Sequence, residues 1–129
     1  MIASLEGTVA AVMHDYMIVT VHGIGYKVFA PASVMSDPGD SLYLHTSLIV
    51  REDSLTLFGF ATPADRDLFE LLLTINGVGP KVGLAILSTL NADNLRNAVV
   101  ADRAEILTRV PGIGKKTAQK ILFELKDKL

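Results

Sequence analysis

The chain has 129 residues, half of them hydrophobic, which suffices for one ordinary domain or two small ones with packed cores. It contains no cysteine, which excludes disulfides, thiolate zinc sites and a cysteine nucleophile. No apolar run approaches the roughly eighteen residues that span a bilayer, and the N-terminus lacks the basic region of a signal peptide. We therefore expect a soluble cytoplasmic protein with no membrane partner.

The charge is unevenly distributed, although the whole chain carries only −2. Residues 1–61 hold two basic and six acidic side chains, whereas residues 62–129 hold ten basic and eight acidic ones. The segment 109–120 contains no acid and four basic residues, Arg109, Lys115, Lys116 and Lys120. Because a local basic cluster matters more for phosphate binding than the total charge, the second half is the candidate for binding a polyanion.

Residues 1–61 are predicted to form a small β-barrel. Short β-branched or aromatic segments predict strands at residues 18–22, 26–29, 42–45 and 55–58. Gly23–Gly25 separates the first two strands, residues 36–40 form a turn cluster, and the Ala/Val run at 9–12 is ambiguous. Several short strands at close spacing favour a five-stranded OB-fold.

From residue 62 onward the pattern changes to helices. Predicted helices begin near Thr62, Pro80, Asn91, Asp102 and Lys115. Thr62 and Asn91 suit N-caps, and Asp102 with Glu105 resembles a capping box for a short helix that ends near Arg109. The predicted fold class is α+β, with an OB-fold over 1–61 and five helices over 62–129.

A short pattern occurs twice in the helical half. Residues 75–81 read Ile-Asn-Gly-Val-Gly-Pro-Lys and residues 110–116 read Val-Pro-Gly-Ile-Gly-Lys-Lys, at an offset of 35 residues. The glycines of the two turns are Gly77, Gly79, Gly112 and Gly114. A tight turn between helices needs positive φ or close backbone approach, which glycine supplies. Val78 and Ile113 are predicted to anchor the turns by inserting between the helices.

The helix that follows each turn begins with free N–H groups and the positive end of its dipole, which together form an anion site. Side chains near the start of these helices could also contact a bound phosphate, the lysines with their positive charge. They are Lys81, Lys115, Lys116 and Thr117. Nothing in this pattern reads base edges, so we expect binding that is independent of sequence. The alternative, an ordinary helix–helix turn, is less consistent with the duplication and the matching lysines.

Two nucleotide-binding motifs are excluded by spacing. A Walker loop needs a first glycine where this chain has Arg109 before Gly114-Lys115-Lys116-Thr117. A dinucleotide fingerprint follows a strand, whereas Gly77, Gly79 and Gly83 follow a helix and have a different spacing. We expect neither cofactor nor metal.

The two turns resemble helix-hairpin-helix motifs, and the whole chain resembles the RuvA family of bacterial Holliday junction-binding proteins. The segments that carry the resemblance are Met1-Ile2, Leu5–Gly7, Gly23–Tyr26, Val50–Asp53, Leu57–Phe60, Asn76–Lys81 and Pro111–Ala118. A helix-hairpin-helix alone is shared by many DNA-binding proteins. Its combination with the β-domain and Arg51-Glu52-Asp53 is far more specific.

The resemblance implies a homotetramer, or an octamer of two stacked tetramers, that holds an open four-way junction in recombination, DNA repair and the SOS response. It implies partnership with the RuvB ATPase and with the RuvC resolvase. The family's third domain, which contacts RuvB, is expected to be absent because the chain ends at Leu129. Junction binding is then expected to persist, and coupling to the motor is left open.

Glu52 and Asp53 are two adjacent carboxylates between predicted strands. From the residues alone they indicate a solvated hairpin tip, since adjacent strand residues face opposite sides and no further acid or histidine is near in sequence. The resemblance implies instead an acidic pin at the centre of the tetramer, without catalytic residues, and a phosphate contact for Arg51. His14, His22 and His45 are scattered and are expected to be surface or strand residues.

Two other classes of function stay open at this point. A helix-hairpin-helix glycosylase would carry a catalytic aspartate downstream of the hairpin, where only Asp127 stands, or a lysine in its second helix. A general DNA-binding or assembly module would use the barrel to oligomerise and leave the lysines solvated. The leading prediction is a non-enzymatic, structure-specific DNA-binding protein.

Overall fold

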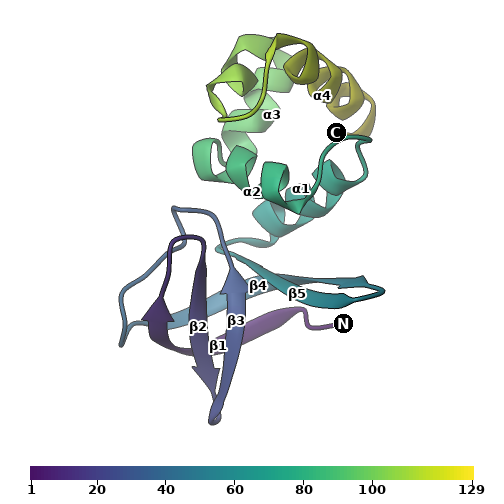
Figure 1. Ribbon diagram of the computed structural model, residues 1–129. Coiled ribbons are helices and arrows are strands. Elements are labelled where there is room, and N and C mark those ends of the chain that lie inside the picture. The colour runs from purple at the N-terminus through teal and green to yellow at the C-terminus, as the bar shows by residue number, and fades with distance from the viewer. The chain divides into compact units, whose positions relative to one another are not determined.

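Five strands close into a barrel in the first half of the chain, in the order β1-β2-β3-β5-β4 (Figure 1). They are β1 (Ser4–Val12), β2 (Tyr16–Val21), β3 (Ile24–Phe29), β4 (Ser41–Arg51) and β5 (Ser54–Phe60). Neighbouring strands are antiparallel except β3 and β5, which run parallel. This computed structural model describes all residues from Met1 to Leu129. It confirms the predicted class, a five-stranded barrel followed by helices.

The barrel interior is filled by apolar side chains from the strands and from Ala30 and Val34, which lie between β3 and β4. The buried cluster comprises Leu5, Val9, Met17, Val19, Val28, Ala30, Val34, Leu44 and Leu57. In β2, for example, Met17 and Val19 are fully buried while Ile18 between them is not, as the period of two in a strand requires. The same alternation was visible in the sequence at residues 42–45 and 55–58.

The first strand, β1, was not predicted. Its residues alternate poorly because Gly7 interrupts them and because the register with β2 shifts between Val9 and Ala11. A Cβ atom at Gly7 would lie 2.3 Å from the Thr20 carbonyl oxygen and 2.8 Å from Val21 Cγ2. Glycine is therefore required by the close approach of β2, a tertiary constraint that a local pattern does not show.

The turn between β2 and β3 is shorter than predicted. Gly23–Gly25 was expected to separate the strands, but Ile24 and Gly25 pair with β2 as part of β3. The loop consists of His22 and Gly23, whose φ angles are 49° and 84°. Positive φ at both positions is the geometry of a two-residue type I′ hairpin turn, which matches the twist of the strands.

The second half of the chain contains four α-helices and one 3₁₀ helix. These are α1 (Pro63–Leu73), α2 (Pro80–Thr89), α3 (Ala92–Val100), η1 (Ala104–Arg109) and α4 (Lys115–Lys128). Both predicted N-caps are confirmed. The Asp65 N–H donates to Thr62 Oγ1 at 3.1 Å, and the Asn94 N–H donates to Asn91 Oδ1 at 2.7 Å.

The predicted capping box at Asp102 and Glu105 is wrong. The short helix there, η1, is 3₁₀ and follows Arg103 without a side-chain cap. Asp102 has a φ of 56°, and its carboxylate accepts a hydrogen bond from Lys126 Nζ at 2.7 Å. Glu105 accepts from Arg103 Nε at 3.0 Å. Its own backbone N–H and then Arg103 lower the pKa of Glu105. Both carboxylates thus have other partners.

Internal contacts divide the chain into two compact units, Met1–Arg66 and Asp67–Leu129. The predicted boundary between residues 61 and 62 stays a prediction. None of the helices combines the length and the hydrophobicity that crossing a membrane requires.

Candidate nucleic-acid interface

The two Gly-apolar-Gly turns have the same backbone geometry. The first glycine of each is left-handed, with φ of 94° at Gly77 and 89° at Gly112. The second glycine, Gly79 or Gly114, is extended and forms the N-cap of α2 or α4. The positive φ accounts for the first glycine of each turn, because residues with a side chain rarely adopt it.

The backbone hydrogen bonds repeat at the same 35-residue offset. The pairs, donor first, are Val78 to Ile75 (3.0 Å), Ile113 to Val110 (3.1 Å), Gly83 to Gly79 (2.9 Å) and Ala118 to Gly114 (2.9 Å). Val78 and Ile113 are 7% and 6% exposed, so the prediction that they anchor the turns is confirmed. The sequence repeat is therefore a structural repeat.

The helices that follow the turns differ from the others at their N-termini. α1 and α3 have side-chain caps and an acid in the first turn, Asp65 and Asp93 respectively. α2 and α4 have neither a side-chain cap nor an acid in the first turn. Pro80, the first residue of α2, has no N–H, but the other N–H groups of the two first turns are left for an external acceptor. The first turn of neither helix carries an acid at the positive end of the dipole.

The second glycine of each turn is not explained by the fold of the protein. Gly79 and Gly114 have ordinary φ values of −94° and −88°, which any residue adopts. A Cβ atom at either position would meet no neighbouring atom within 4 Å, and the same holds at Gly112. Conformation and internal packing would therefore both accept a side chain at Gly79 and Gly114. Because Gly79 and Gly114 have no side chain, a molecule outside the chain can approach the backbone at the start of α2 and α4.

Lysines surround the turns. Lys81, Lys115, Lys116 and Thr117, all predicted as site residues, are exposed in the first turns of α2 and α4. The lysines among them form no ion pair within the chain. Their roles as phosphate ligands stay predictions.

Lys120 is a candidate that the sequence did not assign to the site. Its Nζ lies 4.0 Å from the position of a Cβ at Gly77, so α4, which follows the second turn, brings a charge to the first turn. Two signals pointed to it, the acid-free segment 109–120 and the four-residue spacing from Lys116, which places both on one face of a helix.

Arg51, Glu52 and Asp53 lie at the tip of the β4–β5 hairpin and are all exposed. Arg51 pairs with Ser54, which leaves Glu52 and Asp53 as a two-residue turn. The predicted hairpin tip is confirmed. The two acids belong to the turn and not to a strand, so the opposite-face argument does not apply to them. The turn adds two negative charges to a barrel unit that is already acidic.

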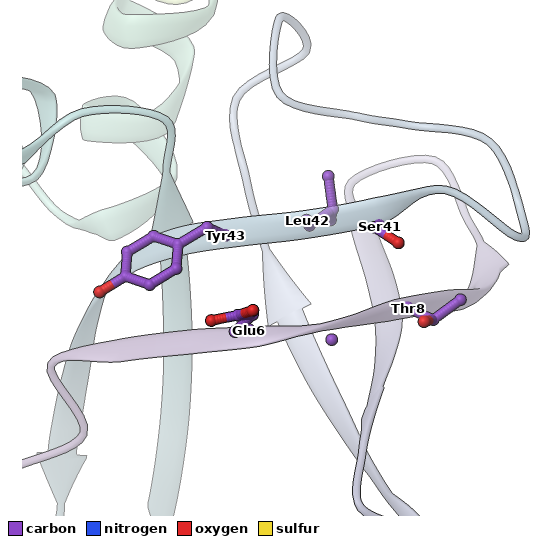
Figure 2. A pocket seen from close by; sticks show the side chains of 6 residues that line it. Glu6, Thr8, Ser41, Leu42 and Tyr43 are labelled. Carbon is purple, nitrogen blue, oxygen red and sulfur yellow. The ribbon is translucent and has the colours of Figure 1, made fainter.

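One further hollow and the histidines of the chain do not form a site that suits phosphate or a metal ion. Figure 2 shows a hollow between β1 and β4, lined by Glu6, Gly7, Thr8, Ser41, Leu42 and Tyr43. It gathers one carboxylate and no cation, which does not suit phosphate. The Tyr43 ring packs edge-on against His45 at 5.2 Å, and His14 and His22 are exposed. No three His, Asp or Glu side chains are grouped to hold a metal ion.

Comparison with known proteins assigns each half of the chain to a family model. Residues 1–59 match the RuvA N terminal domain, and residues 69–127 match a SAM-like helix-hairpin-helix tandem. Relatives named Holliday junction branch migration complex subunit RuvA match the whole chain. That of Chloroflexus aggregans is 47% identical and that of Symbiobacterium thermophilum 49% identical, each over all of this chain. The chain spans 68% and 64% of their lengths, about two thirds.

Proposed function

Because the chain belongs to the RuvA family of Holliday junction branch migration complex subunits, we propose that it binds four-way junction DNA and holds it open for branch migration. In this proposal the chain carries out no bond chemistry itself. It acts in the cytoplasm, in recombination and repair, and the work of translocation belongs to a partner ATPase, RuvB. The relatives' name, subunit of a branch migration complex, supports such a partner.

The observation that carries the proposal is the bareness of Gly79 and Gly114. Each precedes an uncapped helix, and neither needs to be glycine for the sake of the fold. A phosphate group can approach such a turn closely and accept hydrogen bonds from the backbone N–H groups. Contacts of this kind position a protein on DNA without reading its sequence. Two of them in tandem favour a DNA backbone over a single small anion.

Selectivity for a branched shape would come from the assembly. One pair of turns binds a duplex weakly, but a homotetramer presents four pairs to four arms, and linkage of weak sites multiplies affinity. The tetramer is proposed from membership of the RuvA family, and so are the octamer and the contact with RuvC. In the same assembly Glu52 and Asp53 would act as an acidic pin that repels phosphates near the strand crossover, and Arg51 would contact a phosphate.

We expect the protein to retard a four-way junction at lower concentration than a linear duplex of the same arm sequence. Replacing Lys115 or Lys120 with alanine should weaken junction binding, because each loses one phosphate contact. The slope of log affinity against log salt should fall by about one per lysine. Gel shifts over a salt series measure both quantities.

Lys126→Ala is the matched control, since Lys126 lies on the same helix with its ammonium bound to Asp102. It should leave the salt slope unchanged. Equal retardation of junction and duplex would leave only a general DNA-binding module. A slope that Lys115→Ala does not alter would contradict the phosphate assignment at the second turn.

The acidic pin predicts an unusual mutational result. Glu52→Gln with Asp53→Asn should leave junction affinity unchanged or raise it by up to about fivefold, because a close like-charge contact in water is worth about 1 kcal/mol. The rate of spontaneous strand exchange on the bound junction should change, which a fluorescence assay of arm exchange would measure. A large loss of affinity in the folded variant would rule out a repulsive role.

A further inference from the structure

Two exposed apolar side chains lie near the end of the β4–β5 hairpin, which projects from the barrel (Figure 1). Val50 is 66% exposed and Leu55 is 72% exposed, and they are direct partners in the ladder. Opposed residues of an antiparallel pair share a face, so the two side chains form one apolar patch. Only the Arg51–Ser54 pair separates this patch from the acidic turn.

We propose that Val50 and Leu55 form an apolar wedge that packs against a base pair exposed where the strands of a branched DNA separate. This rests on the proposed junction binding and adds a contact that the acids do not make. Proteins that open or kink DNA commonly place aliphatic side chains between base steps, where they replace part of the lost stacking. A carboxylate repels phosphate, but it offers no surface on which a base can stack.

The charges around the patch fit a base pair. The faces of bases are uncharged, whereas the backbone that edges them is negative. Glu52 and Asp53 at the tip keep phosphates away from the end of the hairpin, and the aliphatic pair two ladder steps behind the turn accepts an uncharged surface. Arg51 follows Val50 in β4, so its side chain lies on the opposite face of the hairpin, where it can bind a phosphate without covering the patch.

A second copy of the chain is the competing occupant, and the small size of the patch disfavours it. A stable protein interface buries about 1,200–2,000 Å², far more than two aliphatic side chains provide.

The test uses a four-way junction with 2-aminopurine, an adenine analogue whose fluorescence rises on unstacking, beside the crossover. Saturating wild-type protein should raise the emission. The double variant Val50→Thr, Leu55→Thr should bind the junction and produce less than half of that rise. Threonine keeps the preference for a strand, so the hairpin is expected to fold.

Ile24→Thr is the matched control, because Ile24 is 57% exposed in β3 directly after a two-residue turn. It should reproduce the wild-type rise. A full rise from the double variant would overturn the wedge while leaving junction binding intact. A loss of oligomeric state in the double variant, measured by light scattering, would assign the patch to a subunit contact and also overturn it. Failure of the wild type to bind the junction would refute the proposed function itself, and the wedge with it.

Discussion

Replacing both Gly79 and Gly114 with aspartate should lower affinity for a four-way junction by at least about a hundredfold without destabilising the protein. Hydrogen bonds to a charged group contribute about 1.5–3 kcal/mol each, and 1.4 kcal/mol corresponds to a factor of ten. Aspartate at these positions occupies the backbone N–H groups with its own carboxylate and places a negative charge where a phosphate would bind.

The same substitution should be harmless to the fold. Both glycines have ordinary φ values and open space at the Cβ position. Aspartate is a good N-cap and is favoured at the positive end of a helix by about 0.3–1 kcal/mol. The Tm of the variant should therefore equal or slightly exceed that of the wild type. Affinity falls while stability holds, which few surface substitutions would produce.

A pair of asparagines at the same two positions is the control for charge. Asparagine caps a helix about as well as aspartate, so it competes for the same N–H groups without repelling phosphate. We expect an intermediate affinity, measured by gel shift at fixed salt, with circular dichroism and Tm as the check on folding. Wild-type binding by the folded aspartate variant would contradict the placement of DNA at these turns.

Gly7→Ala should have the largest effect on stability. Its Cβ would lie 2.3 Å from the Thr20 carbonyl oxygen, a backbone atom that cannot move without displacing β2. Overpacking of this kind costs about 3 kcal/mol, which should lower Tm by roughly 10 °C. Thermal unfolding followed by circular dichroism would measure it.

Thr8→Ala provides the comparison, since Thr8 is the next residue of β1 and is exposed. It should change stability by less than about 1 kcal/mol. If the two variants were equally stable, β1 and β2 would lie farther apart than the structure shows. The same two variants should differ little in junction affinity at a temperature where both are folded.

The parts of the fold that were predictable are those decided locally. The turns at Gly77 and Gly112 were recognisable because backbone conformation, anchoring residue and following lysine lie within a few residues of each other. Strands β2 and β3 were located by their β-branched and aromatic residues, β4 and β5 by the alternation of apolar and polar residues, and the caps Thr62 and Asn91 by their residue type. The repeat strengthened the prediction of the two turns, because the same pattern occurs at both places.

The parts that failed are decided by neighbours distant in sequence. β1 was not predicted because the glycine at position 7 is required by close contact with β2 and not by the residues around it. The capping box failed because the Asp102 carboxylate bonds to Lys126 of α4. Lys120 was left out of the site because only the packed structure brings it to Gly77. Short sequence windows describe turns well, but they do not reveal which distant side chain shares a surface with them.

The uncapped N-termini of α2 and α4 also determine how the proposed interface can be studied. A contact made by main-chain N–H groups has no side chain to remove, so an alanine scan would detect only the lysines and underestimate the surface. Gly79 and Gly114 have no side chain to truncate, so every substitution there adds atoms. Substitutions that insert bulk or charge, and ester replacements that delete a single N–H, are the experiments that can map such a surface.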